Sequence, residues 1–327
     1  MNKRLLALAA VAAACAIPSV SAAGTTNVSV LLDWTPNPDH VGLFYAQDEG
    51  LFAKRGLDVS IRPPSDPTTA LKLVAAGKVD YAVSYEQEVY FAAAKKLPVV
   101  AIAAIVPRPL NSIMAIEPQI KNVRDLKGKT IGVTGVPSDD ASLATALSHA
   151  GLTLANVKVQ HVGYNLLPAL LGHKVDAVLG VYRNVEGIEL RQRGFEPTII
   201  PLDKAGVPTY DELVLVASAD RLRSDPAYKV ETRRLVAGFL AGTAAARTHL
   251  KTSLAVLKKE TTSSDAFLAA ATPATLALLT GRGGVGCMRT ATWARFGAWM
   301  HARGLLKTAV PAKDAMTTAF LPARCKR

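Results

Sequence analysis

The sequence contains few of the side chains from which catalytic and metal sites are built. Of its 327 residues, 3 are Cys, 6 are His and 6% are aromatic. The histidines, at positions 40, 149, 161, 173, 249 and 301, are dispersed without a metal-ligand spacing. The GxSxG, HExxH, Walker and Rossmann glycine motifs are all missing. The sequence therefore predicts a protein without catalytic residues, without a metal and without a cofactor.

The basic residues are in excess, but they do not cluster. Lys and Arg number 38 against 26 Asp and Glu, which gives a formal net charge of +12. A nucleic-acid surface needs runs of Lys and Arg interleaved with aromatics, and the sequence has no such run. We therefore expect a solvated basic surface and no nucleic-acid partner.

The N-terminal residues have the order of a secretory signal peptide. Lys3 and Arg4 precede an apolar run from Leu5 to Ile17, which is followed by Pro18 and small residues. The run is shorter than the roughly 20 residues that a membrane-spanning helix needs. We expect a signal peptide at 1–22, cleavage after Ala22 and a periplasmic location.

The cysteines leave two questions open. Cys15 lies in a weak lipoprotein-like context, which makes lipid anchoring a minor alternative to free export. Cys287 and Cys325 remain after signal cleavage, and in an oxidising compartment they form either one disulfide or two free thiols. Two cysteines are too few for a CxxC-type metal site.

Short β-rich runs alternate with amphipathic stretches, a rhythm that predicts an α/β fold with mostly parallel sheets. We expect strands at 28–32, 57–61, 81–84, 99–106, 112–116, 130–133, 157–162, 175–179, 198–200 and 213–217. Helices are expected at 40–54, 67–76, 86–96, 138–150, 166–171, 184–193, 228–248, 264–279 and 290–303.

About 300 mature residues exceed the size at which one hydrophobic core keeps growing, so we expect two lobes. Extended segments at 106–111 and 201–208 indicate that the chain crosses from one lobe to the other and returns. Lobe one then comprises 27–108 plus 206–327, with a helical tail, and lobe two comprises 109–205. Ligands of such folds bind beyond the carboxyl ends of the strands, here in the cleft between the lobes.

The loop after the first strand gathers several polar and aromatic residues at the start of a helix. Asp33, Trp34, Asn37 and His40 lie within one turn, and the Trp34 ring offers a flat face for a planar ligand, worth about 1 kcal/mol beyond burial. The alternative is a Trp packed under the helix, with Asp39 capping that helix.

Two further loops supply candidate ligand-binding residues. Tyr85 can stack on a ring and Glu88 can accept from an amine, although helix capping also explains Glu88. In lobe two, Gly135 and Ser138 begin a helix whose free N–H groups can bind a carbonyl.

Tyr182, Asn184 and Glu186 alternate after a predicted strand and would share one side of extended backbone. They suit a planar polar heterocycle, with Tyr for the ring face, Asn for a ring acceptor and Glu for an exocyclic amine. Alternatively, Asn184 caps a helix and Glu186 lies in its first turn. Tyr210 adds an aromatic at the return crossing.

The strings LDWTPNPDHVGLFYAQDEGLFAKRGLDV, PSDPTTALKLVAAGKVDYAVSYEQEV, GVYRNVEGIEL and PTYDELVLVAS carry a resemblance that covers nearly all of the mature chain. The chain resembles the solute-binding proteins of ABC importers for pyrimidine precursors of thiamine, and also the fungal thiamine-pyrimidine synthases. The resemblance implies a type II-like periplasmic binding protein fold, an aminopyrimidine ligand, an ABC permease as partner and no enzymatic activity. It would give Trp34 and either Tyr182 or Tyr210 stacking roles, and Glu186 the amine contact.

The alternatives concern the cargo and the activity. The same clamp could hold another flat or anionic solute, such as riboflavin or a sulfonate, or it could serve a sensor. A synthase would use His40, but the cysteine cluster of the synthases is missing here. Thr318 stands where the resemblance predicts Asn, and Pro38-Asp39 makes the first loop unusual. We expect a monomer.

Overall fold

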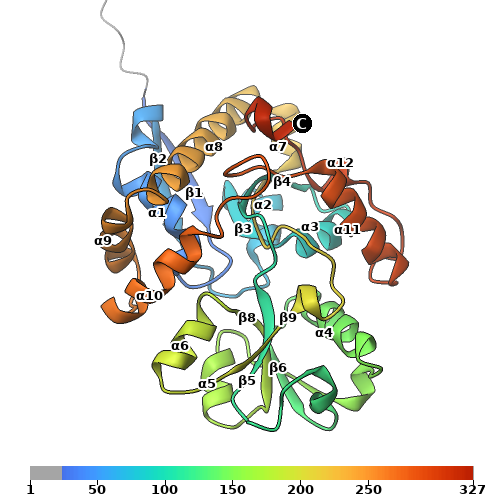
Figure 1. Cartoon of the computed structure of the whole chain (residues 1–327). Helices are drawn as coiled ribbons and strands as arrows, with labels where there is room; N and C mark the ends of the chain where they lie inside the picture. The colour runs from blue at the N-terminus through green and yellow to red at the C-terminus, as the bar shows by residue number, and fades with distance from the viewer. Residues whose placement is uncertain (1–23, 327) are drawn as a thin grey trace, which may run out of the picture.

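The computed structural model describes residues 24–326, and Figure 1 shows two lobes, each built on one sheet. In lobe one the strand order is β2-β1-β3-β10-β4, and in lobe two it is β7-β6-β8-β5-β9. The strands of lobe one are β1 (Thr26–Leu31), β2 (Leu57–Arg62), β3 (Tyr81–Ser84), β4 (Val99–Val106) and β10 (Leu213–Ser218). Those of lobe two are β5 (Asn111–Ala115), β6 (Thr130–Val133), β7 (Lys158–His161), β8 (Ala177–Tyr182) and β9 (Thr198–Pro201).

Each sheet has one strand that runs against the others. β10 pairs antiparallel with β3 and β4, and β5 pairs antiparallel with β8 and β9, whereas β1 and β6 pair parallel with their neighbours. β5 and β10 are the first strands after the two crossings. The chain therefore enters each lobe from the cleft side, and the carboxyl ends of the parallel strands meet at the cleft.

The helices cover the sheets and form the C-terminal layer of lobe one (Figure 1). They are α1 (Val41–Asp48), α2 (Ala70–Ala75), α3 (Glu86–Ala94), α4 (Pro137–His149), α5 (Leu166–Leu171), α6 (Glu186–Gln192), α7 (Ala219–Ser224), α8 (Pro226–Ala246), α9 (Leu250–Glu260), α10 (Asp265–Leu276), α11 (Thr290–Ala302) and α12 (Ala312–Ala315). Short 3₁₀ helices are η1 (Pro38–His40), η2 (Ala53–Arg55), η3 (Val123–Leu126), η4 (Leu154–Asn156), η5 (Leu202–Lys204) and η6 (Ala323–Lys326).

Strand β4 is fully buried although it is the last strand of its sheet. All of its side chains, VVAIAAIV, are buried, as expected for a strand covered on both faces. Its free edge is covered by the C-terminal layer, because the N–H of Thr317 donates to the carbonyl of Ala101 and the N–H of Ala104 donates to the carbonyl of Gly286. Strand β7, at the edge of the other sheet, keeps mostly exposed side chains. The apolar run of β4 therefore predicts its burial, but not its position at the end of the sheet.

Several predicted boundaries are wrong, and each has a local cause. The helix expected at 40–54 ends at Asp48, because Gly50 adopts a left-handed φ of 65° and the chain turns. The helix expected from 67 begins at Ala70, because Asp66 accepts from the N–H of Thr68 and stabilises a turn. Helix α9 was not predicted.

Cys287 and Cys325 are paired in a disulfide across 38 residues, which resolves the alternative of two free thiols. The bond joins η6 to the segment after α10. In the chain-entropy description, closing a loop of that length stabilises the fold by about 4 kcal/mol.

The N-terminal expectations remain predictions. The signal peptide at 1–22 and Cys15 lie outside the described residues. Within residues 24–326, none of the helices combines the length and the apolarity needed to cross a bilayer. The assigned lobe limits, 27–108 plus 206–327 and 109–205, remain a proposal based on the two crossings.

Candidate functional site

Two adjoining cavities lie between the lobes. The inner cavity has a volume of about 30 Å³ and the outer one about 320 Å³, and Asp33, Tyr85 and Val136 line both. The inner cavity is lined by Asp33, Trp34, Asn37, Tyr85, Gln87, Asn111, Thr134, Val136, Ser138, Asp139, Gly180, Tyr182, Glu186 and Glu212. The outer cavity lies between α2, α3 and the start of α4.

The loop after β1 is held by its own side chains. Asn37 accepts from the N–H of Asp39 at 2.8 Å and is the N-cap of η1, so Asp39 is not the cap. The N–H of Asn37 donates to Nδ1 of His40 at 3.3 Å. Because Nδ1 is an acceptor, the ring proton lies on Nε2, which donates to Asp33 at 2.9 Å. Both nitrogens of the fully buried His40 are therefore engaged within the loop.

Asp33 faces the inner cavity and accepts two side-chain hydrogen bonds. Its Oδ1 accepts from His40, and its Oδ2 accepts from the hydroxyl of Tyr85 at 2.9 Å. Burial and the nearby Asp33 carboxylate raise the pKa of Tyr85 well above its ordinary value. Tyr85 therefore stays a neutral hydroxyl that donates to Asp33 while its ring lines the cavity.

Trp34 contacts a residue of the opposite lobe. Its ring meets that of Tyr164 edge-on, with 4.5 Å between the centroids, and the Tyr164 hydroxyl donates to the carbonyl of Pro64 at 3.1 Å. The alternative of a Trp buried under the following helix is wrong, because the half-exposed ring lies at the cleft. Tyr164 was not recognised from the sequence.

Three further hydrogen bonds join the lobes. The backbone N–H of Ser138, in the first turn of α4, donates to Glu88 of lobe one at 2.8 Å. The amide of Asn184 donates to Asp39 at 2.8 Å and to Thr275 at 2.9 Å. The lobes are therefore held together on both sides of the cavities.

Glu212 lies at the return crossing, and its carboxylate binds the backbone of the first crossing. Its carboxylate accepts from the N–H groups of Leu110 and Asn111 at 2.6 and 2.7 Å and from the Tyr210 hydroxyl at 2.9 Å. Burial raises the pKa of Glu212 to about 7.

Two more carboxyl groups of lobe two line the inner cavity. Glu186 accepts from the backbone N–H of Tyr182 at 2.7 Å, and burial raises its pKa to about 8. Asp139 accepts from the Thr134 hydroxyl at 2.6 Å and the Gly135 N–H at 2.8 Å, and burial raises its pKa to about 6. Both groups are desolvated without a cationic side chain beside them.

The ionisable side chains that line the inner cavity are all acidic. Four carboxyl groups, those of Asp33, Asp139, Glu186 and Glu212, belong to its lining, which includes no Lys, Arg or His. Carboxylates accept hydrogen bonds and attract positive charge. The inner cavity is therefore suited to a ligand that presents N–H groups or a positive charge. Among residues 24–326, no cluster of His, Cys, Asp and Glu side chains has the arrangement of a metal site.

The structure divides the predicted site residues into three groups. Seven line the inner cavity: Asp33, Trp34, Asn37, Tyr85, Ser138, Tyr182 and Glu186. Glu88 and Gly135 line the outer cavity. His40, Asn184 and Tyr210 line neither cavity and lie behind the walls, at 0%, 3% and 1% exposure.

The expectation that Tyr182, Asn184 and Glu186 point to one side is wrong. The N–H of Val185 donates to the carbonyl of Tyr182, so the backbone turns after β8 instead of continuing as a strand. Asn184 consequently points to Asp39 and Thr275. It does not cap α6, whereas Glu186 does begin that helix.

Tyr210 also lies elsewhere than expected. It packs 5.2 Å from the ring of Phe296 and supports Glu212, which faces the cavity in its place. The lining residues that were not predicted are Gln87, Asn111, Thr134, Val136, Asp139, Gly180 and Glu212. Of these, Gln87 and Glu212 could have been found from the sequence, because each is a polar residue two positions after a tyrosine that was predicted to bind the ligand.

Comparison with known proteins identifies the family. The sequence model described as NMT1/THI5 like matches residues 37–253, about two thirds of the chain. The chain belongs to the NMT1/THI5-like family.

Two relatives of this family share substantial identity with the chain. A protein of Haemophilus influenzae named for thiamine biosynthesis is 41% identical over 192 residues, 58% of this chain. The formylaminopyrimidine-binding protein of Halalkalibacterium halodurans is 38% identical over 213 residues, 65% of this chain. The matches span about three fifths of the relatives' own length, 61% and 62%.

Solved structures identify the fold. The alkanesulfonate-binding protein SsuA of Xanthomonas axonopodis pv. citri superposes with a TM-score of 0.70 at 16% identity, over 90% of this chain and 99% of that one. The chain therefore has the two-lobed α/β fold of periplasmic binding proteins, as the sequence predicts.

Proposed function

We propose that this protein is the extracytoplasmic solute-binding protein of an ABC importer, and that it captures an aminopyrimidine precursor of thiamine. The cargo is of the hydroxymethylpyrimidine or formylaminopyrimidine type. The relatives in the family support the cargo class, and the fold supports the role of a clamp. Periplasmic location, a monomeric state and delivery to a membrane permease belong to the same proposal.

The observation that carries this proposal is that the inner cavity is lined by carboxyl groups and by no basic side chain. An aminopyrimidine presents an exocyclic amine and a flat ring, and the cavity offers carboxyl groups together with the rings of Trp34, Tyr85 and Tyr182. We assign the amine to Glu186 and the ring faces to Trp34 and Tyr182. Contact with an amine would offset the desolvation that raises the pKa of Glu186.

The size of the cavities bears on how the cargo enters. A cavity of about 150 Å³ holds benzene, whereas the inner cavity measures about 30 Å³. A pyrimidine ring therefore requires the lobes to part, which the two crossings permit. Opening would break contacts between the lobes that include Glu88–Ser138 and Asn184–Asp39.

The alternatives fit the geometry less well. A sulfonate is bound best by positively charged groups, and the inner cavity is lined by four carboxyl groups and by no Lys, Arg or His. A synthase that reacts through His40 would need a free ring nitrogen at the cavity, whereas both His40 nitrogens bond within the loop. These contacts support a binding role for the site.

Native mass spectrometry of the exported protein, purified without refolding, tests the proposal. We expect the released ligand to be an aminopyrimidine, and stripped protein to bind added hydroxymethylpyrimidine or formylaminopyrimidine with a measurable heat. A bound flavin or sulfonate would contradict the cargo class, as would stripped protein that gives no heat or thermal shift with either pyrimidine.

A further inference from the structure

Lobe one carries a second large concavity, separated from the outer cavity of the cleft by Leu97, which lines both. This hollow has a volume of about 830 Å³ and lies among the end of α3, the start of β4, α7, α8 and α12. β4 begins and β10 ends beside it, whereas the opposite ends of both strands lead to the crossings at the cleft. We call it the pole hollow, and its rim includes Lys96, Arg223, Lys229, Arg233 and Lys313.

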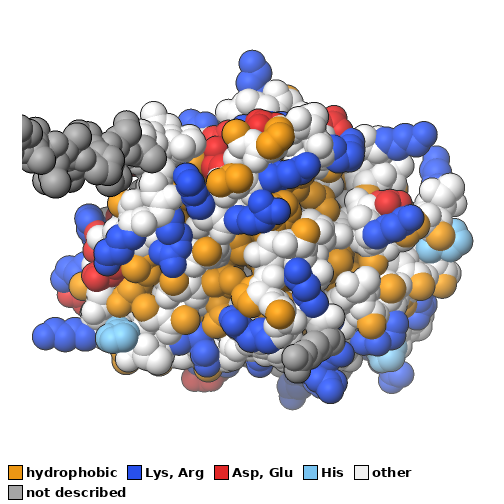
Figure 2. Space-filling model, turned by 90° about the horizontal axis from the view of Figure 1, so that it is seen from above, with side chains coloured by type: hydrophobic (Ala, Val, Ile, Leu, Met, Phe, Trp, Pro, Cys, Tyr) orange, Lys and Arg blue, Asp and Glu red, His pale blue; other side chains and the backbone are white. Residues whose placement is uncertain are grey.

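The pole hollow is basic. Its five Lys and Arg side chains face two acidic ones, Asp220 and Asp314, an excess of three positive charges. Among the described residues, Arg223 is the one of these five that forms an ion pair with a carboxylate, that of Asp220. Figure 2, which views this end of lobe one, shows Lys and Arg side chains gathered around apolar surface.

The lining of the pole hollow is apolar between these charges. Leu97, Pro98, Ala319 and Phe320 belong to it. The guanidinium of Arg233 lies over the ring of Phe320, 5.8 Å from the ring centroid. An apolar lining with a cationic rim is complementary to a segment that combines apolar and acidic side chains.

Two features of the rim lower the stability of the isolated protein. Lys96 follows α3 with a left-handed φ of 58°, a conformation that favours glycine and disfavours other L-residues by about 1 kcal/mol. Lys229 and Arg233 are four residues apart on α8, where like charges repel. Cations at positions that disfavour them point to a role other than stabilising the fold.

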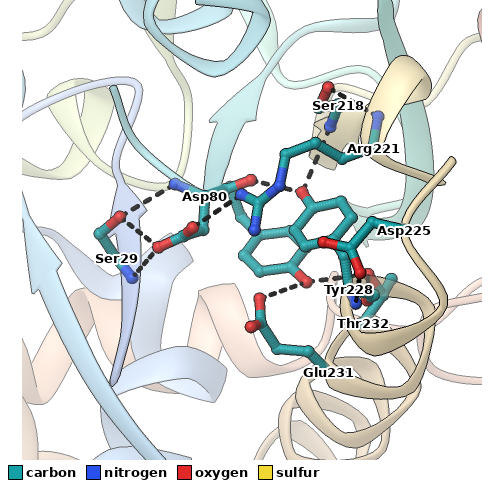
Figure 3. A network of polar contacts seen from close by, with 9 residues as sticks. Ser29, Asp80, Ser218, Arg221, Asp225, Tyr228, Glu231 and Thr232 are labelled. Carbon is teal, nitrogen blue, oxygen red and sulfur yellow. Dashed lines mark hydrogen bonds and ion pairs between the residues drawn. The ribbon is translucent and has the colours of Figure 1, made fainter. Parts of the chain in front are cut away.

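The wall of the pole hollow is held rigidly to the sheet (Figure 3). Arg221 of α7 donates to Asp80 at 2.8 Å and lies 3.8 Å from the centroid of the Tyr228 ring. Tyr228 of α8 stacks on Tyr81 with 5.1 Å between centroids and donates to the Asp80 carbonyl at 2.6 Å. Helices α7 and α8 are therefore positioned before any partner arrives, which lowers the entropy lost on binding.

We propose that the pole hollow docks an acidic, partly apolar peptide segment of a partner protein. The concave shape favours a peptide over a lipid surface, because a flat bilayer would touch the rim and leave the apolar lining uncovered. The proposal does not depend on the cargo in the cleft. It concerns a partner at the opposite end of lobe one.

Selection of short random peptides displayed on phage against the exported protein provides the first test. We expect the selected peptides to be enriched in Asp and Glu together with Leu, Ile or Phe. Their affinity should fall about tenfold or more in the double variant Lys229→Gln/Arg233→Gln. The double variant Lys158→Gln/Lys174→Gln removes the same charge from exposed positions of lobe two and should bind as the wild type does.

Lys96→Gly is the sharper variant, because it separates stability from docking. We expect it to raise the melting temperature by a few degrees and to weaken peptide binding. His173→Gly is the matched control: His173 is the other non-glycine residue with a left-handed φ among residues 24–326, at 52°, and it lies outside the hollow. Its exposed contact with Glu117 adds little stability, so this variant should gain stability and keep peptide binding.

Several outcomes would overturn the proposal. They are a failure to select any peptide, selected peptides without acidic enrichment, and peptides that bind Lys96→Gly and the α8 variant as tightly as the wild type. Binding to phosphatidylglycerol vesicles that the peptides do not displace would assign the surface to a membrane instead. Cargo binding measured in parallel should be the same in all these variants.

Discussion

At the scale of single residues, the cleft is distinguished by carboxyl groups that burial keeps from ionising easily. The pKa values of Glu186, Glu212 and Asp139 are raised to about 8, 7 and 6. No cationic side chain lines the cavity beside them. A ligand with N–H groups would supply the missing donors, and this makes the carboxyl groups the first targets for mutation.

Replacing Glu186 with Gln should weaken cargo binding by roughly ten- to a hundredfold, because an acceptor with charge is lost at the amine. Titration calorimetry with hydroxymethylpyrimidine measures the change. Glu189→Gln is the control, since Glu189 lies in the same helix and pairs with Arg193 at the surface. Equal affinity in Glu186→Gln and the wild type would remove Glu186 from the site.

The same pKa shifts predict how stability changes with pH in the absence of cargo. An acid whose pKa is higher in the folded chain than in the unfolded chain binds more protons when folded, so its contribution is complete below about pH 4 and declines as pH rises through the folded value. We expect the melting temperature to fall from about pH 5 to about pH 8, with a smaller slope in Glu186→Gln. A melting temperature that rises over this interval would contradict the assignment.

At the scale of elements, the closed arrangement depends on a few contacts between segments far apart in the chain. Asn184, in the turn between β8 and α6, reaches η1 and α10 of lobe one through Asp39 and Thr275. Glu88 of α3 meets the start of α4. Each contact joins a segment of one lobe to a segment of the other.

Asn184→Asp should open the clamp, because it replaces an amide donor by a carboxyl group facing Asp39, whose own pKa is raised to about 6 by burial. We expect a larger radius of gyration in solution scattering and faster cargo release. Lowering the pH through about 6 should partly restore closure, since one proton can then be shared between the two carboxyls. Asn122→Asp, an exposed N-cap in lobe two, is the control, and equal scattering of the two variants would contradict the prediction.

At the scale of the whole molecule, lobe one carries the C-terminal layer and the disulfide. The Cys287–Cys325 bond joins the last described helix to the segment between α10 and α11. That segment also contacts a crossing, because Arg108 donates to the carbonyl of Thr280. The C-terminal layer therefore supports the point about which the lobes move.

Reduction of the disulfide, or the double variant Cys287→Ser/Cys325→Ser, should lower the free energy of unfolding by about 2–4 kcal/mol. Denaturant unfolding followed by circular dichroism, with and without reductant, measures the loss. The serine variant should not respond to reductant. A wild-type protein that is equally stable in both conditions would show that the bond adds nothing.

Sequence reasoning located the elements best where a continuous apolar run determines them. The strands at 81–84, 99–106 and 130–133 and the helix at 166–171 have the predicted bounds. Boundaries near turns were less accurate, since Gly50 and Asp66 act through local backbone geometry that a hydrophobic pattern does not record. The site follows the same division: Trp34, Tyr85 and Glu186 lie just after the end of a strand, whereas Tyr164 and Asn111 carry no comparable signal in the sequence.

By itself, the sequence determined the α/β alternation, the two crossings, the family and the loops that meet at the cleft, because periodicity and turn residues act over short distances. The tertiary structure alone decided which side chains of those loops face the cavity. Tyr182 and Glu186 face it while Asn184 turns to Asp39, because a single turn after β8 redirects the chain. It also decided that carboxyl groups from both lobes and from the return crossing are buried together, since only the packed fold brings them close enough to share one cavity.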